Sequence, residues 1–206
     1  MMRIILFALA LAGATSPLAA APLSVRVVDN SGRPVRDAVV TFNPSTGARA
    51  PRTGNRYVVS QKNLKFQPFL SIVPVGAEVS FPNFDPTKHH VYSFSPAKRF
   101  ELKLFARDQS RAVRFDKPGV VALGCNIHDA MSAFIFVTNS AWTARTNAQG
   151  VAVFADAPSA PGRLVVWHPY LRSPGGTMQQ GLAAGQRNAS FSIRLRAPPS
   201  MPMTDY

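Results

Sequence analysis

The sequence predicts an all-β fold built of β-sandwiches. Short runs in which apolar and polar residues alternate recur along most of the chain, which is typical of strands with one buried face. Among the 206 residues, 18 prolines and 13 glycines separate these runs. No long stretch repeats its apolar residues at the 3.6-residue period of a helix. Many short strands at regular spacing therefore indicate sandwiches rather than a mixed fold.

The expected strands follow from these runs in chain order. Asn-Ser-Gly-Arg-Pro after the first run and Asp-Lys-Pro-Gly between two central runs are turn sequences. In residues 99–105 every second residue is apolar, so Phe100, Leu102 and Leu104 are expected on the buried face. The runs that predict strands cover residues 23–29, 37–42, 99–105, 112–115, 119–125, 131–139, 151–156, 163–168 and 189–195.

Both ends of the chain are predicted to lie outside the folded part. Residues 1–21 have the pattern of a secretory signal, with Arg3, an apolar run and small residues up to Ala21. This pattern predicts export and a periplasmic location. The Pro-rich residues 197–206 are predicted to be disordered. No stretch after the signal reaches the roughly 18 apolar residues of a membrane span, so none is expected.

The chain is strongly basic, with 23 Lys and Arg against 10 Asp and Glu and a formal net charge of +13. Such an excess favours anionic partners, among them acidic redox proteins and anionic membrane surfaces. Predicted export, and the lack of a basic helix or an RNA-binding motif, argue against nucleic acid as a partner. A solvated surface is the simplest interpretation of most of this charge.

The most informative motif is Cys-Asn-Ile-His-Asp-Ala-Met, which contains the only cysteine of the chain. It places a thiolate, an imidazole and a thioether at i, i+3 and i+6, on Cys125, His128 and Met131. Mononuclear copper sites for electron transfer use one Cys and two His in a near-trigonal plane, with a distant Met. The second imidazole is available upstream at His89 or His90. The residues therefore favour a copper site.

The predicted strands explain how these donors would meet. Cys125 ends one strand and the next begins near Met131, so His128 must lie on a short connecting loop. The upstream histidine begins a strand 35 or 36 residues earlier, which in a sandwich can be the neighbouring strand. Alternation of side chains along that strand favours His89 over His90 as the ligand.

The central part of the chain resembles a cupredoxin, the family of plastocyanin and amicyanin. The resemblance rests on three motifs, FQPFLSIVPVGAEVSFPNFD, KHHVYSF and GVVALGCNIHDAM. The short Cys-x-x-His-x-x-Met loop is similar to that of amicyanin. In that family the upstream ligand opens a His-Asn-Val triplet, and His90 stands here in place of the Asn that helps to tether the ligand loop. The resemblance implies one mononuclear copper ion, Cu(I) or Cu(II), bound by His89, Cys125, His128 and Met131.

The flanking sequences resemble a second family. Two segments are similar to the early and late strands of carboxypeptidase regulatory-like domains. They are SVRVVDNSGRPVRDAVVTF and TNAQGVAVFADAPSAPGRLVVWHPYL, respectively. They imply one transthyretin-like sandwich into which the cupredoxin segment is inserted. The whole arrangement resembles exported bacterial proteins labelled methylamine utilization proteins. The predicted organisation is a signal peptide (1–21), a first part of the regulatory-like sandwich (22–54), the cupredoxin domain (55–138), a second part of the regulatory-like sandwich (139–196) and the tail (197–206).

Other chemistries find little support in the sequence. A structural zinc site needs four Cys or His donors, haem attachment needs a Cys-x-x-Cys-His motif, and a hydrolase elbow needs Gly-x-Ser-x-Gly. The chain has only one Cys to offer a zinc site, it contains neither of the two motifs, and we expect no enzyme activity. His168 alternates with apolar residues and is expected to be a hydrogen-bonded structural histidine. Met201 and Met203 are expected to be ordinary tail residues.

Three functions are compatible with these expectations. The first is an exported blue-copper protein that carries single electrons to a redox protein partner, with an acidic partner favoured by the charge. The second is a periplasmic protein that binds or delivers copper without redox shuttling. The third is a structural binding module with a cupredoxin fold. The complete donor set favours the first two, and the sequence makes no prediction of the oligomeric state.

Overall fold

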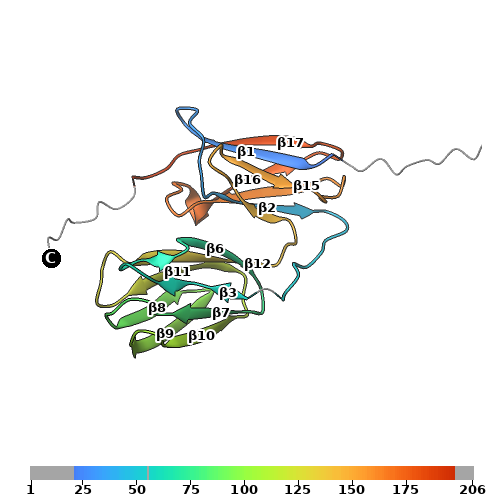
Figure 1. Ribbon diagram of the computed structural model, residues 1–206. Coiled ribbons are helices and arrows are strands. Elements are labelled where there is room, and N and C mark those ends of the chain that lie inside the picture. Colours follow the sequence, from blue (N-terminus) through green and yellow to red (C-terminus); the bar gives the residue numbers. More distant parts are fainter. Residues whose placement is uncertain (1–20, 55, 198–206) are drawn as a thin grey trace, which may run out of the picture.

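The computed structural model describes residues 21–54 and 56–197. This part of the chain is all-β apart from one 3₁₀ turn, η1 (Pro174–Gly176), so the predicted fold class is confirmed. Two β-sandwiches are stacked on each other (Figure 1). Within the described residues, no helix is long and apolar enough to cross a membrane. The predicted signal (1–21, except its last residue) and tail (197–206, except its first) lie outside the described residues.

The first sandwich combines strands from the two ends of the described chain. One sheet has the order β14-β1-β17 and the other the order β13-β2-β15-β16. β1 pairs in parallel with β17, and the other pairs are antiparallel. The strands are β1 (Leu23–Asp29), β2 (Val39–Pro44), β13 (Thr143–Arg145), β14 (Val151–Phe154), β15 (Gly162–Trp167), β16 (Thr177–Leu182) and β17 (Asn188–Ile193).

The second sandwich contains the central part of the chain, for which the sequence predicts a cupredoxin domain. Its larger sheet has the order β6-β12-β11-β8-β9, its smaller sheet the order β10-β7-β3, and β4 and β5 form a hairpin. β6 pairs in parallel with β12, and β3 with β7. The strands are β3 (Tyr57–Val58), β4 (Ser60–Gln61), β5 (Phe66–Gln67), β6 (Leu70–Pro74), β7 (Ala77–Pro82), β8 (His89–Ser95), β9 (Lys98–Phe105), β10 (Ser110–Phe115), β11 (Gly119–Cys125) and β12 (Ser132–Thr138).

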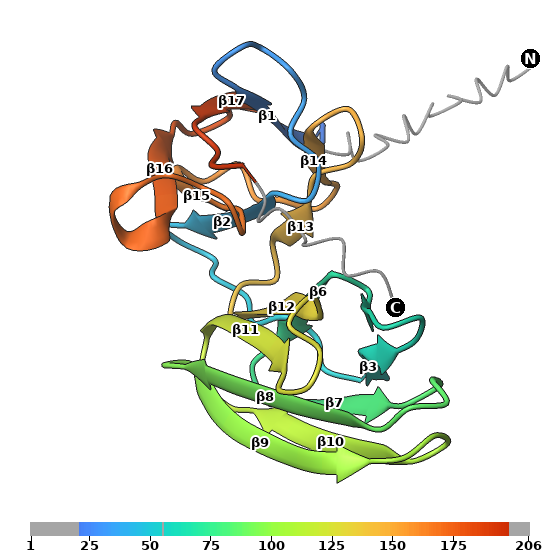
Figure 2. The same ribbon diagram turned by 90° about the vertical axis from the view of Figure 1, so that its left-hand side faces the viewer.

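The second sandwich is an insertion between two neighbouring strands of the first. The chain leaves the first sandwich after β2 and returns to it with β13, which pairs with β2 through Thr41 and Thr143. Both connections therefore leave the first sandwich from the same pair of strands (Figure 2). The relation of this sandwich to regulatory-like domains, and the domain boundaries given above, stay predictions from the sequence.

The alternation of side chains holds along most strands but fails near the end of β9. Phe100 and Leu102 pack against the core of the second sandwich, as expected. The prediction for Leu104 is wrong, because its side chain is 53% exposed and Phe105 is buried instead. The cause is an irregular register opposite His89 and Val91, where β9 contains an additional residue.

The two sandwiches meet through an aromatic contact surface. Trp167 of β15 packs against Phe134 and Phe136 of β12, with ring centroids 5.7 Å apart in both pairs. Phe69 stacks on Tyr170 at a centroid distance of 6.5 Å. Since Trp167 is only 8% exposed, the first sandwich shields part of the outer face of the sheet that contains β12.

Replacing this tryptophan is expected to destabilise the protein. We expect Trp167→Ala to lower the free energy of unfolding by about 3 kcal/mol, because the large side chain leaves a cavity between the sandwiches. Val153→Ala is the control, since Val153 is 53% exposed and its loss should change stability by less than about 0.5 kcal/mol. Urea unfolding followed by circular dichroism measures both. Equal stabilities of the two variants would contradict this account of the contact.

Candidate metal centre

Three of the four predicted ligands lie together at one end of the second sandwich. His89 is the first residue of β8, Cys125 is the last residue of β11, and His128 lies on the loop that leads to β12. β8 and β11 are antiparallel neighbours in which Cys125 lies opposite Val91. The strand pairing therefore brings the thiol next to the side chain two residues before Val91, which is His89.

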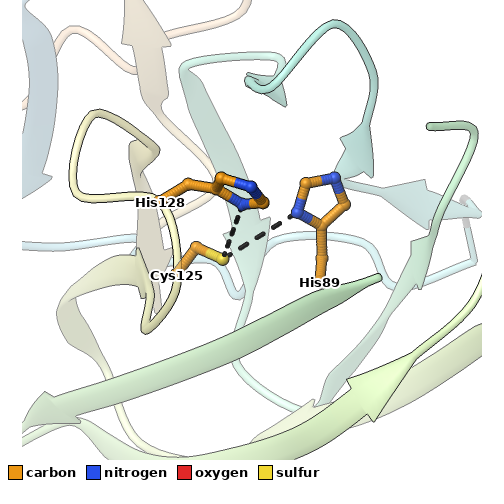
Figure 3. A group of neighbouring side chains, drawn as sticks. All are labelled: His89, Cys125 and His128. Atoms are coloured by element: carbon orange, nitrogen blue, oxygen red, sulfur yellow. Dashed lines mark hydrogen bonds between the residues drawn. The ribbon is translucent and has the colours of Figure 1, made fainter. Parts of the chain in front are cut away.

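The donor atoms face one another. The Cys125 Sγ lies 3.9 Å from Nδ1 of His89 and 3.7 Å from Nδ1 of His128, contacts drawn as dashed lines in Figure 3. The three ligand atoms all lie within 4.8 Å of one another. The two imidazole rings meet edge to face, with centroids 5.0 Å apart. Two nitrogens and one sulfur thus surround a common point.

These distances fit a metal ion bound in a near-trigonal plane. Bonds of about 2.3 Å to sulfur and about 2.0–2.1 Å to imidazole nitrogen, at an angle near 120°, separate the sulfur and nitrogen donors by about 3.8 Å. The observed separations are 3.7 and 3.9 Å. The side chains can therefore receive an ion with little rearrangement. A thiolate with two imidazoles is the donor set that copper prefers in electron-transfer proteins.

Burial distinguishes the four predicted ligands. His89 is 0%, Cys125 3% and Met131 2% exposed, whereas His128 is half-buried. Met131 belongs to the same buried apolar cluster as Cys125. Its backbone N–H donates to the His128 carbonyl at 3.0 Å, which closes the short ligand loop. The site is therefore enclosed by the sandwich core, with His128 as the predicted ligand nearest to solvent.

His90 points away from this site. Its Nε2 lies 3.0 Å from a carboxylate oxygen of Glu101 on β9, in a geometry that does not form a hydrogen bond. Its ring lies near Tyr92, at a centroid distance of 6.1 Å, on the outer face of the sheet. His89, in contrast, shares the buried face with Val91. Only His89 of this pair can share an ion with Cys125.

Asp85 also belongs to the site, although it was not predicted from the sequence. Its Oδ2 lies 2.8 Å from Nε2 of His89, and both groups are buried. The carboxylate also accepts the backbone N–H groups of Asn63 (2.5 Å) and Leu64 (3.0 Å). Because the carboxylate is an acceptor, Nε2 of His89 carries the proton and Nδ1 keeps a free lone pair toward Cys125. The sequence did contain one signal for this role, because Asp85 lies four positions before the candidate ligand His89.

The electrostatics of the site keep its groups ready to bind a cation. Burial raises the pKa of Asp85, but hydrogen bonds from Leu64, His89 and Asn63 outweigh this effect, so the pKa lies below its usual value. Burial lowers the pKa of His128, and the neighbouring His89 lowers it further, while Asp85 opposes the change. Asp85 is therefore ionised and His128 neutral at pH 7, the states in which a metal site is most readily formed.

Three exposed apolar residues are neighbours of the site residues in the sequence or through a hydrogen bond. Ile127, next to His128, is 47% exposed, and Phe84, next to Asp85, is 49% exposed. Leu64, whose N–H binds Asp85, is 47% exposed. We call Leu64, Phe84 and Ile127 the apolar rim. Its members come from three loops that meet at the donor set.

Comparisons with known proteins give partial structural likenesses. No protein-family model and no curated protein sequence matches the chain. A Cu-containing nitrite reductase from Thermus scotoductus SA-01 is similar over 47% of this chain and 25% of its own, with 24% identity and a TM-score of 0.40. A reduced mutant of amicyanin is similar over 48% of this chain and 98% of its own, with 21% identity and a TM-score of 0.38. A purple cupredoxin from Nitrosopumilus maritimus is similar over 40% of this chain and 99% of its own, with 18% identity and a TM-score of 0.36.

Removing the carboxylate behind His89 is expected to weaken metal binding. We expect Asp85→Asn to lower the affinity for copper by about 10-fold to 100-fold, because the amide accepts more weakly and no longer fixes the imidazole tautomer. Competition against a chelator of known copper affinity measures the change. Asp129→Asn is the matched control, since it removes the same charge from an exposed position on the ligand loop. Equal losses of copper affinity in both variants would show that only the net charge matters, and would contradict a specific role of Asp85.

Proposed function

We propose that this chain is a mononuclear copper protein that carries single electrons, with His89, Cys125, His128 and Met131 as ligands. The observation that carries the proposal is the pair of imidazole Nδ1 atoms at 3.7 and 3.9 Å from one buried cysteine sulfur. Copper, when bound, supplies the Cu(I)/Cu(II) couple. A cupredoxin sandwich with this donor set supports electron transfer over copper storage or a purely structural role.

The proposed role of each ligand follows from its position. Cys125 is the strongly bonded donor, and its burial protects the thiolate from stray oxidation. Met131, from the core, would supply the weakly bonded thioether. His89 is held by Asp85, so its ring keeps one orientation. Pairing of β8 with β11 holds His89 and Cys125 in place, which favours a small rearrangement on electron transfer.

His128 is the proposed point at which electrons enter and leave. It is half-buried, whereas the other three ligands are buried, and the apolar rim lies beside it. Apolar contact lets a partner dock closely and exclude water, while charge steers the encounter. Because the chain carries a net charge of +13, an acidic redox protein is the proposed partner.

The remaining parts of the proposal rest on the sequence. The signal-like residues 1–21 support export to the periplasm. The two resemblances support a place among proteins of the methylamine utilization type. We assign no catalysis to this chain, because its proposed chemistry is complete once an electron has passed through the donor set.

The visible spectrum of the copper-loaded protein tests the proposal. We expect an intense band near roughly 600 nm on Cu(II) addition, from charge transfer between the thiolate and copper, and we expect Cys125→Ser to abolish it. His89→Ala should also remove the band. His90→Ala is the control and should keep it, because His90 faces away from the site. A colourless complex, unchanged by Cys125→Ser, would contradict electron transfer through this site.

The apolar rim is expected to control the rate of electron exchange. We expect Ile127→Ser to slow self-exchange between the Cu(I) and Cu(II) forms by about tenfold, which corresponds to about 1.4 kcal/mol of lost contact. NMR line broadening in mixtures of the two forms measures this rate. Val153→Ser, a comparable change at an exposed valine of the first sandwich, should leave the rate unchanged. An unaltered rate in Ile127→Ser would place the docking surface elsewhere.

A further inference from the structure

The two sandwiches differ in which basic residues carry their positive charge. Residues 22–54 and 139–197, which include the first sandwich, contain 11 Arg and no Lys, against 3 Asp and no Glu. All 6 lysines of the chain lie between residues 62 and 117. Arginine differs from lysine in its planar fork of N–H donors, which matches the oxygens of phosphate groups. The first sandwich therefore carries an excess of the side chain best suited to bind oxyanions.

The carboxylates of the first sandwich are already paired. Asp29 contacts Arg33 at 2.8 Å, Asp37 contacts Arg36 and Arg145 at 3.5 Å each, and Asp156 contacts Arg49. Over the described part of the first sandwich, the other seven arginines have no carboxylate within 4.0 Å: Arg26, Arg52, Arg163, Arg172, Arg187, Arg194 and Arg196. Arg187 donates to the Ala157 carbonyl and to Ser159, and Arg196 donates to the Pro169 carbonyl, but these acceptors are uncharged, so the charge of these arginines is not neutralised by a carboxylate.

Three of these arginines lie on one face of a short antiparallel pairing that follows β17. Leu171 pairs with Leu195, and the Arg172 N–H donates to the Arg194 carbonyl at 2.7 Å. Both leucines pack against the core of the first sandwich, so the alternating Arg172, Arg194 and Arg196 are exposed on the other face. Arg172 lies directly opposite Arg194. Like charges in such a pair are destabilising.

A cleft of about 450 Å³ adjoins this face, between the turn after β1 and the segment after β17. The two segments leave the sandwich at the same end (Figure 1) because β1 and β17 are parallel. Arg33, Arg194 and Arg196 line the cleft, together with Asp29 and Ser31. Asp29 accepts hydrogen bonds from Ser31 and Arg33, and its charge is offset by Arg33. The Asp29 contact holds Arg33 in place, with most of its side chain exposed.

We propose that Arg33, Arg172, Arg194 and Arg196, which we call the arginine cluster, form a binding site for phosphate groups. The ligand class is a phosphate-bearing anion, either free or in the headgroup of an anionic lipid. The forked guanidinium groups bind phosphate oxygens in pairs, and such charge-assisted bonds are stronger than neutral ones. A bound anion also reduces the repulsion between Arg172 and Arg194. This site is independent of the copper site and of the function proposed for it.

Binding of defined probes to the full-length, copper-free protein tests this site. The probes are pyrophosphate, followed by NMR shifts, and phosphatidylcholine vesicles with and without phosphatidylglycerol, followed by sedimentation, all at constant ionic strength. We expect Arg172→Gln/Arg194→Gln to weaken binding by about tenfold. The matched control is Arg26→Gln/Arg163→Gln, which removes the same charge from two other exposed arginines and should change affinity less than about twofold.

The arms of the experiment identify the source of the phosphate. Binding of pyrophosphate alone supports a free anion, and binding of phosphatidylglycerol vesicles supports a lipid headgroup. Absence of binding to both probes overturns the proposal. Equal losses in the two double variants also overturn it, because they would show a general charge effect. The cluster variant should fold, since removal of a like-charge pair is not expected to cost stability, and circular dichroism checks this.

Discussion

The pairing of β8 with β11 is the constraint on which the candidate metal centre depends. Cys125 lies opposite Val91, so its thiol points to the same buried face as His89. Side chains alternate with a period of two, and a shift of the register by one residue would turn the thiol to the outer face. The register is held by the apolar face of the strand, where Val121 and Leu123 are buried in the core. The same packing that forms the sandwich therefore positions the donors.

The first sandwich supports this arrangement from the opposite side of the sheet. β12 begins directly after the ligand loop, and its Phe134 and Phe136 are covered by Trp167. Both connections to the inserted sandwich also leave from the paired strands β2 and β13. The inserted sandwich is thus held at its two chain connections and through an aromatic contact, and a rigid frame of this kind favours small rearrangement at a redox site.

The sequence was sufficient to predict the position of a side chain wherever that position depends on a local pattern. Alternation placed His89 on the buried face, and the short spacing from Cys125 placed His128 on a loop beside it. It failed for Leu104, because a bulge in β9 depends on the partner strand and not on the local run. It also gave no role to Asp85, whose backbone partners lie 21 and 22 residues earlier in the chain. The four-residue spacing from Asp85 to His89 is a local signal, but the contacts with Asn63 and Leu64 form only in the folded protein.

The distribution of charge is compatible with cation binding in the core of a strongly basic chain. Asp85 is buried as an anion, stabilised by N–H donors rather than by a lysine or arginine. No basic side chain within the described residues forms an ion pair with it apart from His89. The exposed arginines act through solvent, where ions screen charges over about 8 Å. Within the low-dielectric core, the charge of the Asp85 carboxylate is felt far more strongly. The local field at the donors therefore favours a cation, whereas the outer surface favours anions.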